Sequence, residues 1–194
     1  MNDLPLRAFA ALVLVVPSTG CLSTPTAPRH EFVEPIAPPL NAMASDSAPL
    51  GVHLVGVSAA ETARDVLSWR DGDGSVWRDE GTRFSSAPAD FVRRSFQRRL
   101  AGGSASRARL EVELLHFGAR TTESGTAAEV VVFALLEDEE GALRLAREYH
   151  ETLAVPSPIA PGRGSAAMLA VALGAATETI VERVLADVAR ELAN

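Results

Sequence analysis

The alternation of apolar and polar positions predicts three consecutive β-strands in the second half of the chain. Residues 108–117 place an apolar side chain at nearly every second position, which is the pattern of a half-buried strand. Residues 128–138 are apolar on both alternating sets of positions, as in a central strand covered on two faces. Residues 142–155 follow an acidic turn and contain the third strand. These segments predict a sheet with residues 128–138 at its centre.

The segment before them predicts a further strand and a β-hairpin. Residues 50–58 are apolar at alternating positions between glycines, which favours a strand. Residues 61–84 contain two short runs on either side of the sequence Asp-Gly-Asp-Gly at residues 71–74. Asp and Gly accept positive φ angles at low cost, so we expect residues 71–74 to form the turn of a hairpin.

Two segments have the apolar spacing and the end signals of α-helices. The first begins at Ser86 or Ala87, has Pro88 in its first turn and stops before Gly102. The second spans residues 165–192 near the C-terminus. The apolar stripe of the first helix leaves three arginines on its far side: Arg93, Arg94 and Arg98.

The economical architecture for these elements is an α+β fold, in which an antiparallel β-sheet carries both helices on one face. Residues 21–49 are rich in proline, serine and threonine, a composition that favours extended chain. We therefore expect a signal peptide at residues 1–20, a proline-rich tether at residues 21–49 and one α+β domain at residues 50–194. Residues 30–34 could add an edge strand to the sheet.

The single cysteine of the chain, Cys21, follows an apolar run. Residues 8–16 are too short for a membrane span of about 20 residues, but with Arg7 before them they suit the apolar region of a secretory signal. The sequence Ser-Thr-Gly-Cys at residues 18–21 resembles the lipobox of bacterial lipoproteins, although its first residue is serine where that motif usually has leucine. The resemblance implies cleavage between Gly20 and Cys21 and a thioether-linked diacylglyceryl group on Cys21.

Acylation would make Cys21 a membrane anchor, because each buried CH₂ group contributes about 0.8 kcal/mol and such proteins carry more than one acyl chain. Leu22, and not aspartate, follows the cysteine. By resemblance to the sorting signals of enterobacterial lipoproteins, this residue favours the outer membrane, with the domain on the periplasmic face. The alternative is an ordinary secretory signal, cleaved near Gly20, that leaves Cys21 unmodified.

The charge balance argues against nucleic acid as a partner. The chain has a formal net charge of −7, and all 18 of its basic residues are arginine. Proteins that bind nucleic acid usually show a basic excess clustered on one face. Here a single small basic cluster occurs, at residues 91–100.

Candidate catalytic and metal-binding residues are sparse. Asp71, Asp73 and Ser75 match the first ligand positions of an EF-hand loop, but Val76 stands where that loop needs glycine and Thr82 where it needs a bidentate glutamate. A hairpin turn accounts for these residues better. The four histidines lack the spacing of metal-ligand pairs. We expect no catalytic residue, no metal and no cofactor, and therefore a protein that is not an enzyme.

The order of the elements and two of the segments resemble a known family. The predicted order of elements is hairpin, helix, three strands and helix. This order, together with the sequences of residues 67–100 and 165–192, resembles the ABC-type transport auxiliary lipoprotein component family, which includes paraquat-inducible protein C-like proteins. The likeness covers about residues 29–193. Phe84 takes the place of an aromatic residue, usually tryptophan, that precedes the helix in that family, whereas Gly81 replaces a tyrosine.

The resemblance implies a role and partners. Members of the family are outer-membrane lipoproteins that act with mammalian-cell-entry (MCE) domain proteins and an ABC permease and ATPase, moving phospholipid or other lipid between membranes. A second copy of the chain is a further candidate partner. The alternative function is that of a structural or assembly lipoprotein, which stabilises an envelope complex without handling lipid.

A predicted contact surface lies on the sheet face that the helices leave open. A two-layer domain needs one apolar face on each strand, yet residues 128–138 have two, so a partner chain, an intramolecular segment or lipid must bury the second. Aromatic residues are enriched at interfaces, and arginine binds phosphates and acidic surfaces. The predicted partner or lipid contacts are Trp69, Trp77, Phe84, Val131, Phe133, Leu135, Arg93, Arg94 and Arg98.

Overall fold

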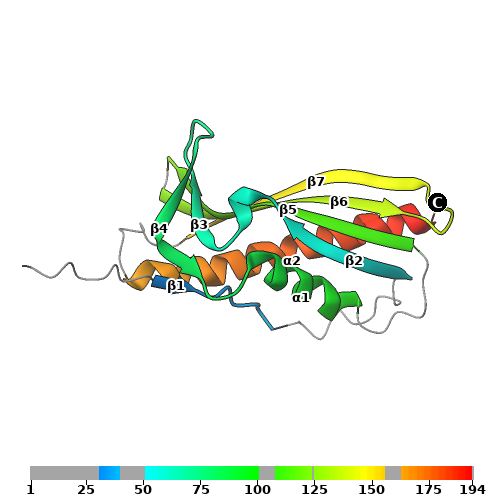
Figure 1. Ribbon diagram of the computed structural model, residues 1–194, viewed down its shortest axis with the longest axis horizontal. Helices are drawn as coiled ribbons and strands as arrows, with labels where there is room; N and C mark the ends of the chain where they lie inside the picture. Colours follow the sequence, from blue (N-terminus) through cyan, green and yellow to red (C-terminus); the bar gives the residue numbers. More distant parts are fainter. Residues whose placement is uncertain (1–30, 40–50, 101–107, 124, 156–162, 194) are drawn as a thin grey trace, which may run out of the picture.

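A computed structural model describes residues 31–39, 51–100, 108–123, 125–155 and 163–193 (Figure 1). The predicted signal peptide, the cleavage site at Gly20 and Cys21, and most of the predicted tether lie outside these residues. Within them the chain forms a seven-stranded sheet and two long helices, which is an α+β fold.

The elements follow one another as the apolar patterns predict, and the edge strand considered at residues 30–34 is present as a short first strand. The strands are β1 (Glu31–Val33), β2 (Val52–Ala59), β3 (Val66–Arg70), β4 (Val76–Phe84), β5 (Ala108–Thr122), β6 (Gly125–Glu137) and β7 (Leu143–Ala154). The helices are α1 (Pro88–Leu100) and α2 (Arg163–Ala193), and a short 3-10 helix, η2 (Glu61–Ala63), follows β2.

The sheet is mixed, so the predicted antiparallel sheet is wrong in part. Its order is β1-β4-β3-β5-β6-β7, with β2 also paired to β5. Strands β5, β6 and β7 are antiparallel, and β3 and β4 form the predicted hairpin. However, β2 and β3 run parallel to β5, and β1 runs parallel to β4. The cause is α1, which returns the chain along β2, so that β5 starts beside the start of β2 and follows it in the same direction.

Both helices cover the same face of the sheet, and the core lies between them and this face (Figure 1). The residues of β6 that point to the core, from Ala128 to Leu136, are fully buried, as is Ile180 on α2. Tyr149 on β7 donates a hydrogen bond of 2.9 Å to Asp187, which ties the sheet to the last turns of α2. In the described part of the chain, no helix is long and apolar enough to span a membrane.

A β-bulge in β5 determines which side chains reach the open face of the sheet. Leu115 is the extra residue, between the pairs Leu114–Val132 and His116–Val131. The bulge shifts the alternation by one position. As a result, His116 turns from the helix-covered face to the open face.

Residues 31–39, which the sequence assigns to the tether and a short edge strand, pack against the domain. Strand β1 pairs with the end of β4, and the Ile36 N–H donates a hydrogen bond of 3.2 Å to the Ala170 carbonyl on α2. The backbone passes so close to Gly174 that an ideal Cβ there would lie 1.8 Å from the Ile36 carbonyl oxygen. Helix α2 therefore needs a glycine where this segment crosses it.

Candidate functional site

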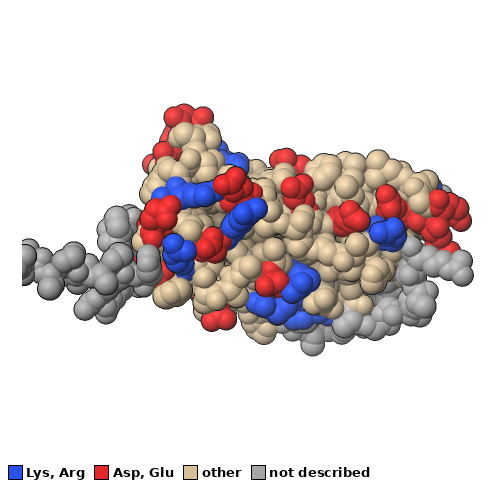
Figure 2. All heavy atoms as spheres, in the orientation of Figure 1, with Lys and Arg blue, Asp and Glu red and all other residues tan. Residues whose placement is uncertain are grey.

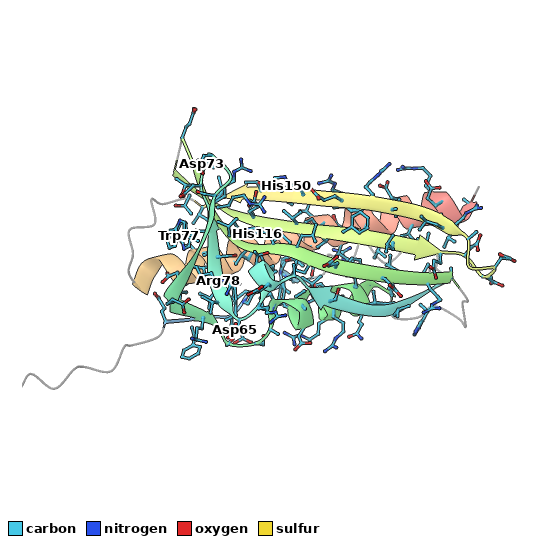
Figure 3. All side chains as sticks on the ribbon, turned by 45° about the horizontal axis from the view of Figure 1, so that its top comes forward. Asp65, Asp73, Trp77, Arg78, His116 and His150 are labelled. Carbon is cyan, nitrogen blue, oxygen red and sulfur yellow. The ribbon has the colours of Figure 1, made fainter. Side chains whose placement is uncertain are left out.

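A buried carboxylate, Glu129, lies on the open face of β6 among four basic side chains. It is 0% exposed. Arg120 Nη1 donates a hydrogen bond of 3.0 Å to its Oε1, and Arg70 Nε lies 3.4 Å from its Oε2. His150 Nε2 is 2.8 Å from Oε1, and His116 Nε2 is 3.3 Å from Oε2 (Figure 3). We call these five residues the Glu129 cluster.

The Glu129 cluster joins four strands. Arg70 is at the end of β3, His116 and Arg120 are on β5, Glu129 is on β6, and His150 is on β7. The sequence gives no spacing that groups these residues, because each strand contributes only one or two of them. The one available signal was Glu129 itself, a charged residue in an otherwise apolar strand. The cluster fixes the turn end of the hairpin to the rest of the sheet.

His116 is the member of the cluster with the strongest electrostatic perturbation. Burial lowers its pKa from 6.5 to about 4; the nearby Glu129 carboxylate opposes this shift, and the positive charges of Arg70 and Arg120 add to it. Neither ring nitrogen has hydrogen-bond geometry toward a described residue. His116 is therefore neutral at neutral pH, and its short distance to Glu129 is a packing contact and not an ion pair.

The EF-hand-like residues form the turn of the hairpin, as the favoured interpretation of the sequence predicts. Asp73 Oδ1 accepts hydrogen bonds from the Ser75 N–H (2.9 Å) and the Ser75 hydroxyl (2.7 Å), and these bonds lower the pKa of Asp73. Gly74 has a φ of 88°, which glycine adopts without strain. Among the described residues, no group of three or more His, Cys, Asp or Glu side chains could hold a metal ion.

The predicted contact residues Trp69 and Trp77 form one aromatic pair on the hairpin. They are cross-strand partners, and their rings stack with centroids 5.4 Å apart and an interplanar angle of 4°. Trp77 is 46% exposed, whereas Trp69 is half-buried. The hairpin therefore presents the Trp77 ring to solvent (Figure 3).

The open face of β6 carries a narrow apolar stripe. Val131 is buried at 4% exposure, whereas Phe133 and Leu135 are half-buried. Phe133 lies opposite Glu113 on β5 and Glu148 on β7. The surplus apolar face predicted from the sequence is thus one strand wide and flanked by acidic side chains.

Phe84 lies in the core and not on the surface. It is 6% exposed and packs edge-on against Phe117, with ring centroids 5.3 Å apart. This position corrects its predicted role as a contact residue, because so buried a ring offers almost no surface to a partner. The environment of Phe84 depends on its packing against Phe117 of β5, which the local sequence does not show.

The three predicted arginines of α1 have different environments. Arg93 pairs with Asp90 on the same helix at 2.6 Å, and Arg94 has no ion pair with a described residue. Arg98 is exposed, as its place on the far side of the apolar stripe predicts, and it also donates a hydrogen bond of 2.5 Å to Glu178 on α2. This ion pair forms because α1 packs against α2 and places Glu178 opposite Arg98.

A hollow of about 230 Å³ lies between α1 and the N-terminal segment. It is lined by Pro35, Ala37, Phe91, Arg94, Ser95 and Arg98. Figure 2 shows basic side chains gathered over α1. A smaller hollow of about 140 Å³ lies at the base of the hairpin, near Asp65 and Arg78 (Figure 3). Its ion pairs are internal: Arg78 lies 3.3 Å from Glu61, and Arg83 lies 3.1 Å from Asp65.

No family model and no curated protein matches this chain. Several solved structures do. Protein XCC0632 from Xanthomonas campestris, assigned to the family DUF330, matches with a TM-score of 0.60 and 14% identity over 87% of this chain and 92% of that protein. An uncharacterized protein matches with a TM-score of 0.55 and 13% identity, over 84% of this chain and 99% of its own. The hypothetical protein CT253 from Chlamydia trachomatis matches with a TM-score of 0.50 and 11% identity, over 74% of this chain and 98% of that protein. At these identities the likeness shows a shared fold.

Proposed function

We propose that this chain is a lipid-anchored accessory component of an ABC/MCE-type system that moves phospholipid between membranes. It is anchored through Cys21 to the outer membrane and exposes its domain to the periplasm. Three observations support the proposal: the lipobox-like sequence at residues 18–21, the resemblance over residues 29–193, and a fold shared with the DUF330 protein XCC0632.

The observation that carries the proposal is the docking of the segment that leads from Cys21 to the domain. Strand β1 pairs with β4, and Ile36 binds α2, so this segment joins the domain at one end. That end also carries the hairpin and the start of α2; we call it the hairpin end (Figure 1). The stretch from Cys21 to Glu31 spans at most roughly 35 Å when fully extended. An acylated Cys21 therefore keeps the hairpin end near the membrane.

The exposed side chains of the hairpin end fit this orientation. Phe32 is 64% exposed and Ile36 is 55% exposed, both in the docked segment. The turn between β6 and β7 and the end of α2 lie at the opposite end of the domain (Figure 1). The proposed anchor thus leaves that opposite end and the open sheet face available to the transport complex.

The Cys21→Ser variant tests the anchor. We expect it to be either unprocessed, with its signal peptide retained, or soluble, and in both cases to lack acyl mass, because no thiolate remains to take the diacylglyceryl group. The wild-type protein should fractionate with the outer membrane and carry that mass. Cell fractionation and intact-mass spectrometry are the measurements, and an unmodified Cys21 in mature wild-type protein would rule out the anchor.

Copurification tests the transport role separately. Wild-type protein should copurify with an MCE-domain protein from its own cell envelope, and deletion should slow phospholipid exchange between the membranes. Association without any change in phospholipid exchange would favour the alternative, a structural or assembly lipoprotein.

A further inference from the structure

The hollow on α1 combines a basic rim with an apolar floor. Arg94 and Arg98 are four residues apart on one helix, so both guanidinium groups lie on the same side of α1. Phe91 lies one turn before Ser95 and contributes an aromatic ring to the same hollow. Arginine and an apolar wall in one small cavity fit a ligand that is anionic at one end and apolar at the other.

Among the described residues, Arg94 is the α1 arginine that has no ion pair. Arg98 Nη2 donates hydrogen bonds to Glu178 at 2.5 Å and to the Ser95 hydroxyl at 3.1 Å. These bonds fix the position of the Arg98 guanidinium, and the Glu178 carboxylate balances its charge. Arg93 is paired with Asp90 at 2.6 Å. Arg94, in contrast, lines the hollow without an ion pair to a described residue.

The second wall of the hollow comes from the segment that leads to the predicted anchor. Pro35 and Ala37 line the cavity, and Ile36 between them is fixed by its 3.2 Å hydrogen bond to Ala170 and by its close approach to Gly174. The hollow therefore exists in this form only while residues 34–37 are docked on α2. A ligand bound in the hollow would therefore stabilise the docking of residues 34–37 on α2. Docking of these residues would in turn strengthen binding of the ligand, because both need the wall that Pro35 and Ala37 form.

We propose that this hollow binds the headgroup of an anionic phospholipid, with its phosphate on the Arg94 guanidinium and the first carbons of the lipid against Pro35, Ala37 and Phe91. A guanidinium fork matches two phosphate oxygens. The volume of about 230 Å³ suits a headgroup and a few carbons, not two complete acyl chains. The choice of a phospholipid over a free phosphate rests on the proposed function, whereas the anion site rests on the geometry.

Binding of a soluble short-chain lipid tests the site on the full chain carrying Cys21→Ser, so the result does not depend on acylation. Dihexanoylphosphatidylglycerol below its micellar concentration is titrated by calorimetry, and inorganic phosphate is titrated in parallel. We expect saturable lipid binding, at least tenfold weaker binding to Arg94→Ala, and binding within twofold of the parent for the matched control Arg93→Ala. Both variants should unfold at the temperature of the parent, since both side chains are exposed and the ion pair of Arg93 with Asp90 lies at the surface.

A second variant tests the wall. Gly174→Ala should displace residues 34–37, because its Cβ would collide with the Ile36 carbonyl oxygen. We expect faster hydrogen exchange of the Ile36 amide and at least fivefold weaker lipid binding. Undocking with unchanged lipid binding would overturn the role of the segment.

Three results would overturn the site as a whole or its ligand. Absence of saturable lipid binding, or equal losses in Arg93→Ala and Arg94→Ala, would remove the site. Inorganic phosphate binding as tightly as the lipid would show a free-phosphate site and overturn the lipid assignment. Failure of Cys21 acylation in cells would contradict the proposed anchor and leave these binding results unchanged.

Discussion

Glu129 shows how a single polar residue can organise a sheet. Its carboxylate is fully buried, yet Arg70 and Arg120 are each about one-third exposed at 29% and 33%. A buried charge needs paired and hydrogen-bonded partners, and these arginines reach the carboxylate from solvent. We interpret the Glu129 cluster as a structural clamp at the turn end of the hairpin.

His116 gives the clamp a pH dependence. Its pKa is lowered from 6.5 to about 4 in the folded protein, so between these values the unfolded chain binds a proton that the folded chain does not. The destabilising effect of His116 is therefore absent above pH 6.5. The free energy of unfolding then decreases as the pH falls from 6.5 toward 4. We expect this group to remove up to about 3 kcal/mol of unfolding free energy over that range, as measured by urea denaturation at pH 7, 6, 5 and 4.

The matched variants are His116→Gln and His53→Gln. His53 is exposed on β2, so its replacement should leave the pH dependence of stability near that of wild type. His116→Gln should flatten it, whatever its stability at pH 7. A His116 ring that titrates near pH 6.5 in the folded protein by NMR would contradict the prediction.

Most of the elements could be predicted from local patterns. The apolar spacing of β5, β6, β7 and both helices is continuous along the sequence, and the Asp-Gly-Asp-Gly turn marks the hairpin. The parallel pairing of β2 and β3 with β5 could not be predicted in this way, because it depends on where α1 returns the chain. The place of His116 on the open face depends in turn on the bulge at Leu115, where the apolar positions shift from Val112 and Leu114 to Phe117 and Ala119, a change that the prediction of a regular strand did not include.

Gly118 allows β3 and β5 to pair closely, because it lies on β5 directly opposite Ser68 of β3. An ideal Cβ at Gly118 would lie 2.0 Å from the Ser68 carbonyl oxygen. We expect Gly118→Ala to lower the unfolding free energy by about 3 kcal/mol, because backbone atoms of β3 must move. Chemical denaturation measures the change.

The control for Gly118 is Gly72→Ala in the hairpin turn. No atom lies within 4 Å of an ideal Cβ at Gly72, so its stability should stay within about 0.5 kcal/mol of wild type. Equal stability of the two variants would mean that β3 does not press on β5 as the structure describes.

The hairpin end, where we propose that the anchor attaches, and the open sheet face are two separate surfaces of the molecule, and we expect a different kind of contact at each. The docked segment places the exposed Phe32 and Ile36 at the hairpin end, while the stripe at Phe133 and Leu135 lies along the sheet. The proposed anchor uses the hairpin end. The stripe is therefore the surface that we expect to meet the MCE-domain protein or a second copy of the chain.

Phe133→Arg tests the open face with little harm to the fold. Phe133 lies between Glu113 and Glu148 on the neighbouring strands, so an arginine there gains two acidic neighbours and keeps a long apolar stem. We expect a stability change of about 1 kcal/mol, together with loss of copurification with the MCE-domain protein. Val171→Arg is the control, because Val171 is 52% exposed on α2, which covers the other face of the sheet. Light scattering on the same variants separates a second copy from a different partner. Retained association in both assays, with the fold intact, would exclude this face from partner binding.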